Sequence, residues 1–524
     1  MNENVFRSKP MIMEFVIRRR PAQIVIPVEC EGNYVIDWND NDDAAKDNSL
    51  LTANVQTHEY TRSGTYIIKI YGKIKRLCGW SIYSSRYLRK VISYGDSAIK
   101  KLAFESARSL ISIPDDLPKG ATDISNMFYC ATKFNSPINF DTSSVVDMSR
   151  MFYEAESFNS EINIDTSSVK NMHGMFCGAR EFNPSAINFN TINVEDVSNM
   201  FNGANKFNPL ELNLNTSNVT NMSSMFCFTK LFNPSILSLN TEKVLNMSYM
   251  FYYAINFNPS GMLQLNFDTS NVTDMNNMFG YAKRFNKPLG FNTSNVVNME
   301  NMFNGAKEFN SSLDSFDTSK VINMSQMFYN SKKFNQTLDT FDVSSVTHMN
   351  YMFWGATNFN KPLTFNTEKV VNMFNMFAYC KKLNSPISLN TKNVIYMGDM
   401  FSDCCNFNQI VDFNTHNVID MSGMFRNCKN FNPPGLKLIA FDTTNLVDVS
   451  GMFSGCSSLN PSGIPSINFN VRDVETTKDM FSGCSSLKGP VIINDCLIIN
   501  LDKCYQTIIE QLSKVKKKNY YNPP

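Results

Sequence analysis

Histidine and tryptophan are scarce in this chain, with 4 His and 3 Trp among 524 residues. Histidine is the side chain that most often serves as a general acid or base, so little material is left for an active site of that kind. The four histidines, His58, His173, His348 and His416, are scattered through the sequence. No P-loop, G-x-G-x-x-G or H-E-x-x-H motif occurs. The sequence therefore predicts a protein that is not an enzyme, with no catalytic residues and no cofactor.

An excess of charge of one sign is also missing. Lys plus Arg number 48 and Asp plus Glu number 47, which leaves a net charge of +1. A nucleic-acid binder needs a basic field, so no nucleic-acid partner is expected. No run reaches the roughly 18 apolar residues of a membrane span. The N-terminal segment has no secretory-signal pattern, because Arg18 to Arg20 follow its short apolar patch. We expect no membrane span, and a location in a host cytoplasm or on a particle.

The abundant residues are Phe, Met and Asn, of which there are 42, 30 and 68. The dipeptide Met-Phe occurs fifteen times, at intervals of 24 to 28 residues. A second Phe or Leu follows six residues after each of these phenylalanines. Units this short cannot bury an apolar face alone and must stack on their neighbours. The predicted core includes Phe152, Phe158, Phe176, Phe182, Phe201, Phe207, Phe226 and Phe232.

Each unit contains apolar residues in two different spacings, one typical of a helix and one typical of a strand. Val145, Met148, Met151 and Ala155 are spaced like one face of a short helix. The stretch from 158 to 164 alternates between apolar and polar residues, as a short strand does. The expected fold is an α/β repeat solenoid, with a parallel sheet on one face and short helices on the other, preceded by a small β-sandwich.

The Asn that follows the second large residue in almost every unit has two interpretations. Asn135, Asn159 and Asn183 could form a ladder that satisfies backbone groups, or an outward row that binds sugar. The ladder is favoured because the position adjoins a core residue. Polar residues that differ between units would form the partner-binding face, and they are Ser136, Glu161, Ser185 and Glu211.

Five domains are expected from these patterns. Residues 1–10 form a disordered start, 11–75 a small β-sandwich, and 76–100 a junction and N-terminal cap. Residues 101–495 form the repeat solenoid of about 16 coils. Residues 496–524 form a C-terminal cap, which the array needs at its end, and a basic tail.

Metal binding is not expected. None of the 13 cysteines forms a C-x-x-C pair, which argues against a zinc site. Five of them stand where other units have Ala, and this favours a buried, apolar role. Asp37, Asp40, Asp42 and Asp43 raise the alternative of a calcium site, but they lack an ordered ligand spacing, and a solvated turn is favoured.

Close copies of one motif are Val219-Thr-Asn-Met222-Ser-Ser-Met225-Phe226 and the segment from Val296 to Ala306. They resemble the BspA-like leucine-rich-repeat surface-protein family, in its branch of lipoprotein-associated bacterial surface repeats. The resemblance implies a leucine-rich-repeat-like solenoid and, in many relatives, display on the cell surface or adhesion. It implies no catalytic residues. The segment around Trp38 and His58 resembles a PKD-like β-sandwich, with Asn39 in place of the turn glycine.

The leading hypothesis is thus a non-enzymatic protein-binding solenoid that mediates protein–protein or host/surface interaction. The alternatives are a structural spacer or particle-surface component, and, least favoured, an enzyme. The identity of the partner and the oligomeric state are left open.

Overall fold

The computed structural model describes residues 8–19, 21–40, 51, 55–185, 187–433, 441–442, 445–460, 467–469, 477–488, 491–493 and 496–498. The chain divides into two compact units, Met1–Met262 and Leu263–Pro524, and each is described by itself. Most of the predicted disordered start (1–10) and of the predicted C-terminal cap (496–524) lies outside the described residues.

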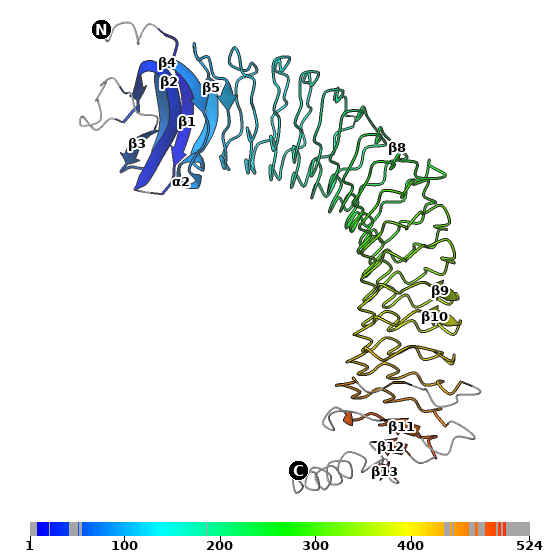
Figure 1. The fold of residues 1–524 in the computed structure, drawn as a ribbon. Coiled ribbons are helices and arrows are strands. Elements are labelled where there is room, and N and C mark those ends of the chain that lie inside the picture. Colours follow the sequence, from blue (N-terminus) through cyan, green and yellow to red (C-terminus); the bar gives the residue numbers. More distant parts are fainter. Residues whose placement is uncertain are drawn as a thin grey trace, which may run out of the picture. The chain divides into compact units, whose positions relative to one another are not determined.

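Unit 1 begins with a β-sheet (Figure 1). Its strands are β1 (Met11–Ile17), β2 (Ala22–Asp37), β3 (Val55–Tyr60), β4 (Gly64–Leu77), β5 (Leu88–Ser93) and β6 (Lys101–Leu102). They lie in the order β3-β2-β4-β1-β5, with antiparallel neighbours, and β6 pairs in parallel with β4. Alternate residues of β1 are buried, as expected for a strand with one face on a core. The short helix α2 (Ile82–Ser85) begins after Ser81, whose side chain accepts a hydrogen bond from the N–H of Tyr83.

The strand pairing of this region differs from that of the predicted β-sandwich. All six strands belong to one hydrogen-bonded sheet, whereas a sandwich has two. The long strand β2 pairs with β3 from Ala22 to Pro27 and with β4 from Val28 to Asp37. Strands β5 and β6 extend this sheet beyond residue 75. A PKD-like identity for residues 11–75 stays a prediction.

The repeats contain turns where short helices were predicted, and that prediction is wrong for the described residues. Arg150 and Glu154 have φ angles of 54° and 52°, in the left-handed region that breaks a right-handed helix. The N–H of Met148 donates to the carbonyl of Asn171 in the next coil, 3.1 Å away. In an α-helix this N–H would donate to the carbonyl four residues earlier. Here it donates to the neighbouring coil instead, so the hydrogen bonds that would stabilise a helix are not formed.

Successive coils are joined by parallel pairing, as predicted, but the pairing is interrupted. Single bridges link one residue of each coil to the next, as in Asp147 with Asn171 and Asn171 with Asp196. Short strands pair in parallel at a second position, β7 (Glu211–Leu214) with β8 (Ile236–Leu239) in unit 1 and β9 (Leu363–Phe365) with β10 (Ile387–Leu389) in unit 2 (Figure 1). In unit 2, β11 (Ile467–Phe469) also pairs in parallel with β12 (Val491–Ile493), and β13 (Cys496–Ile498) is antiparallel to β12.

The predicted core is confirmed. All eight phenylalanines named above are fully buried. The rings of Phe176, Phe201 and Phe226 form a stack, with centroid separations of 5.7 and 5.8 Å. The second column packs against the first, and the rings of Phe201 and Phe207 are 4.1 Å apart. Each coil therefore covers the apolar side of its neighbour, which is the expected behaviour of a repeat protein.

Candidate functional site

The predicted partner-binding residues lie in unit 1, and one of them, Glu211, belongs to a strand. Glu161, Ser185 and Glu211 are exposed. Ser136 is half-buried, and its hydroxyl donates to the carbonyl of Ile111, 2.7 Å away. Glu211 opens β7 and lies opposite Ile236 of β8. Three of the four side chains are thus accessible, and their binding role stays a prediction.

The asparagine row forms the predicted ladder. The side-chain oxygen of Asn135 accepts from the backbone N–H of Asn159, 2.8 Å away, and that of Asn159 accepts from Asn183, 2.7 Å away. The same bond recurs along unit 2, for example from the N–H of Asn335 to Asn310. The structural interpretation is confirmed, although these side chains are also largely exposed.

In unit 2, the residues six positions before the Met-Phe phenylalanines form a column that is more apolar than the polar rows described above. We call this column the ladder face, and it comprises Val297, Ile322, Thr347, Val371, Ile395, Ile419 and Val447. The N–H of each of the last six donates to the carbonyl of the one before it, at 2.9 to 3.1 Å. Ile322 and Val447 are each 47% exposed. The backbone bonds hold β-branched side chains in a regular row at the surface.

Aromatic side chains follow three of the ladder-face residues within four positions of the sequence. Tyr396 follows Ile395 directly and is 43% exposed. The half-buried rings of Tyr351 and Phe374 meet edge to face, 5.6 Å apart. A Cβ on Gly398 would come within 2.9 Å of the Phe374 ring, so glycine leaves the room that this ring occupies. Aromatic groups, of which Tyr396 is exposed and Tyr351 and Phe374 are half-buried, thus lie close in sequence to the β-branched row.

Sequence reasoning missed the ladder face because it assigned these residues to a helix. A signal was present nonetheless. Val296-Val297, Val321-Ile322, Val370-Val371, Val394-Ile395 and Val418-Ile419 are pairs of β-branched residues. Such pairs are typical of extended backbone, since branching at Cβ restricts the side chain against a helical turn.

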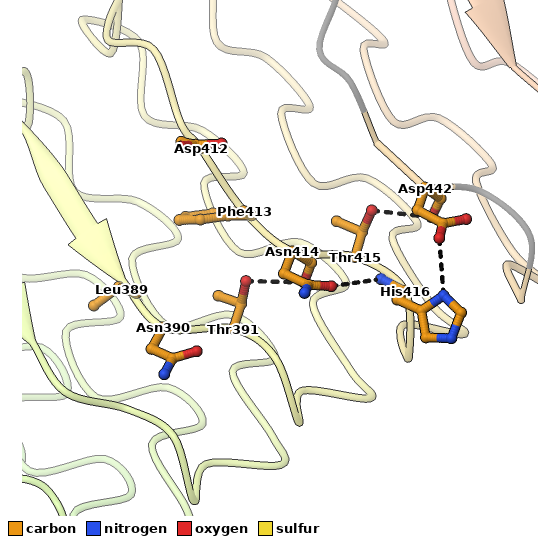
Figure 2. Close-up of a pocket in the computed structure, with 9 residues that line it drawn as sticks. All are labelled: Leu389, Asn390, Thr391, Asp412, Phe413, Asn414, Thr415, His416 and Asp442. Carbon is orange, nitrogen blue, oxygen red and sulfur yellow. Dashed lines mark hydrogen bonds and ion pairs between the residues drawn. The ribbon is translucent and has the colours of Figure 1, made fainter.

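A polar pocket of about 520 Å³ lies among the Asx-Thr turns of unit 2 (Figure 2). Its lining residues are Leu389, Asn390, Thr391, Asp412, Phe413, Asn414, Thr415, His416 and Asp442. The imidazole Nδ1 of His416 lies 2.8 Å from a carboxylate oxygen of Asp442. The hydroxyls of Thr391 and Thr415 both donate to backbone carbonyls, of Asn414 and Asp442, at 2.9 Å. Neither hydroxyl is therefore directed at the histidine as an activated nucleophile would be.

The cysteines of the array are buried in a column. The thiols of Cys380, Cys404 and Cys428 each donate to a backbone carbonyl of the preceding coil, 3.0 Å away. Burial raises the pKa of these thiols well above the usual value, so the reactive thiolate is disfavoured. The apolar role predicted for this column is confirmed by its burial.

In the part of the chain that the structure describes, the aspartates of the acidic turn in unit 1 contact basic side chains of the same chain. A carboxylate oxygen of Asp40 lies 3.0 Å from the imidazole Nε2 of His58, and Asp37 lies 3.9 Å from the ammonium of Lys69. Asp42 and Asp43 lie outside the described residues. Over the described residues, no three His, Cys, Asp or Glu side chains are grouped so that they could hold a metal ion. Nor does any described helix have the length and apolar character to cross a bilayer.

Comparison with solved structures finds a leucine rich cell surface protein from Faecalibacterium prausnitzii A2-165. It is 12% identical, and the match covers 80% of this chain and 92% of that chain with a TM-score of 0.35. No curated protein matches the chain.

A family model described as "Mycoplasma protein of unknown function, DUF285" matches six overlapping segments. They are residues 117–213, 211–290, 262–364, 290–389, 362–437 and 408–506. These segments cover most of the repeat array and more than half of the chain. The protein therefore belongs to the family described as Mycoplasma protein of unknown function, DUF285.

Proposed function

We propose that this chain is a non-enzymatic solenoid that binds a protein partner through the ladder face of unit 2. The observation that carries the proposal is the row of β-branched side chains from Val297 to Val447, in which Val297, Ile322 and Val447 are exposed and the other four are half-buried. Contiguous apolar groups at the surface of a protein mark sites of interaction, and aromatic residues are enriched in the centres of interfaces.

Rigidity of the scaffold supports the same proposal. Six of the seven ladder-face residues follow a fully buried valine, as Ile322 follows Val321, and Val447 follows the fully buried Leu446. The backbone at each position is hydrogen-bonded to the neighbouring coil. A surface held in this way loses little conformational entropy when a partner binds, and more of the contact energy appears as affinity.

The test is the double substitution Ile322→Asp and Ile395→Asp, made in the full chain. Ile322 is exposed and Ile395 is half-buried, and neither belongs to the fully buried core, so the fold should be retained, and thermal unfolding checks this. We expect partners recovered by cross-linking from the source cells to be lost from the variant. Quantitative mass spectrometry of the cross-linked material provides the measurement.

Thr220 offers a matched control. It occupies the same column in unit 1, it is exposed, and its N–H donates to the carbonyl of Glu195, 3.0 Å away. Thr220→Asp should leave partner recovery unchanged. If the double variant recovers the same partners in the same yield as the unmodified chain, the ladder face is not the binding surface. A purely structural spacer, the alternative function, would give that result.

A further inference from the structure

One edge of unit 2 carries far more positive charge than the rest of the protein. In five successive coils, the fourth to ninth residues after the Met-Phe phenylalanine form turns, at 283–288, 307–312, 332–337, 357–362 and 381–386. We call these 30 residues the basic edge. They hold one carboxylate, Glu308, and nine cations. The cations are Lys283, Arg284, Lys287, Lys307, Lys332, Lys333, Lys361, Lys381 and Lys382. The net charge of the edge is thus +8, in a chain whose net charge is +1.

The corresponding turns of unit 1 show that the fold does not require this charge. Residues 156–161, 180–185, 205–210, 230–235 and 255–260 hold three cations and three carboxylates. Four of these six groups pair between coils, Arg180 with Glu156 at 3.4 Å and Lys206 with Glu181 at 2.5 Å. Within the described basic edge, the one ion pair joins Lys333 to Glu308. The positive and negative charges at this edge of unit 1 balance, whereas most of the cations at the edge of unit 2 are exposed and have no carboxylate beside them among the described ion pairs.

Backbone hydrogen bonds hold the basic turns in register. The N–H of Glu308 donates to the carbonyl of Lys283, that of Lys333 to Lys307, and that of Asn358 to Lys332, at 3.1 to 3.2 Å. Adjacent paired strands are about 4.8 Å apart. The first position of these segments holds Lys283, Lys307, Lys332 and Lys381, so cations recur at about this interval along the stack, with one interruption at Thr357. Fixed like charges so close together repel one another, and a linear polyanion would relieve that repulsion.

We propose that the basic edge binds an anionic polysaccharide. Beside the cations runs a row of carboxamides, including Asn310, Asn335, Asn360 and Asn384. Their oxygens accept bonds within the ladder, and their NH₂ groups are donors suited to sugar hydroxyls. Single-stranded nucleic acid binds instead on exposed aromatic rings. The aromatic rings of the basic edge, such as Phe334 and Phe359, are fully buried.

The experiment measures binding of the full-length protein to heparin, which is sulfated, and to polygalacturonate, which is carboxylated. Neutral dextran and polyuridylate are tested in parallel. We expect one or both anionic polysaccharides to bind, with an affinity that falls as salt rises, because binding releases counterions. Comparison of the two tells sulfate from carboxylate recognition. We expect no binding of dextran, and weaker binding of polyuridylate.

The test variant is Lys332→Gln, Lys381→Gln and Lys382→Gln together. These side chains are exposed, so the substitutions should leave thermal unfolding unchanged. We expect affinity to fall about tenfold or more, with a shallower salt dependence. The same residues changed to Arg should retain binding. The matched control removes three cations from unit 1, with Arg180→Gln, Lys206→Gln and Lys230→Gln, and should retain binding as well.

Three results would overturn the proposal. The first is that neither heparin nor polygalacturonate binds at low salt. The second is that the unit 1 control weakens binding as much as the unit 2 variant, which would mean that the basic edge is not the site. The third is that polyuridylate binds as tightly as the better polysaccharide, which would assign the surface to nucleic acid or to polyanions in general.

Discussion

The side-chain oxygen of Asn183 accepts a hydrogen bond from the backbone N–H of Asn208, one coil later and 2.9 Å away. Asn208 does the same for Asn233, at 2.7 Å. Each amide therefore satisfies a backbone group that the turn leaves without a partner in its own coil. The ladder gives neighbouring coils a fixed register outside the apolar core.

Removal of one rung of this ladder should have a modest cost. Asn208→Ala leaves the N–H of Asn233 without its acceptor, and we expect a loss of about 0.5–1.5 kcal/mol in the free energy of unfolding. Asn208→Asp keeps an acceptor oxygen and should lose less. Urea denaturation of both variants checks this. Equal losses for Ala and Asp would show that the oxygen is not what stabilises the turn.

The stacked phenylalanines should dominate stability. Phe201 is fully buried between Phe176 and Phe226, so Phe201→Ala should cost about 3–5 kcal/mol in the free energy of unfolding. Phe228 is 40% exposed, and Phe228→Ala should cost less than about 1 kcal/mol. The measurement is again urea unfolding, followed by circular dichroism. Similar costs for the two would contradict the assignment of Phe201 to the core.

Acid should weaken the aspartate-capped turns. The hydroxyl and N–H of Ser319 both donate to Asp317 and hold the pKa of its carboxyl below the usual value. A lowered pKa in the folded state means that the stabilisation is present above the unfolded pKa of about 4 and is lost as the pH falls through the folded value.

Asparagine fills the same position in another coil, where Asn292 accepts from the N–H of Ser294 at 3.1 Å. Asp317→Asn should therefore keep the turn and remove its titration. We expect the urea midpoint of the natural chain to fall more steeply below about pH 4 than that of the variant. Parallel curves for the two proteins would rule out a contribution from Asp317.

Neighbouring thiols should differ in reactivity. Burial raises the pKa of Cys404, whose thiol is fully buried, whereas the adjacent Cys405 is half-buried. Treatment with a maleimide at about pH 8 should label Cys405 and leave Cys404 unmodified until the chain is unfolded in urea. Peptide mass spectrometry distinguishes the two. Labelling of Cys404 at the rate of Cys405 in the native protein would show that this column opens.

The α-helix prediction failed for a reason that spacing cannot reveal. The positions of Val145, Met148 and Met151 suit one face of a helix, and all three are buried as such a face would be. A chain of tight turns buries residues at the same intervals. Whether an N–H bonds within its own coil or to the next depends on the presence of a stacked neighbour, as the bond from Met148 to Asn171 shows.

The repeat period, the buried columns of Phe, Met and Cys, and the asparagine ladder all followed from residue order, because a short unit copied many times can hide its apolar side in only one general way. The surfaces depended on folding. Val297 and Ile322 are 25 positions apart in the chain, and Lys283 and Lys382 are 99 apart. They became parts of a ladder face and a basic edge when hydrogen bonds between coils stacked the turns in register, since side chains distant in sequence gain a common surface only through those contacts.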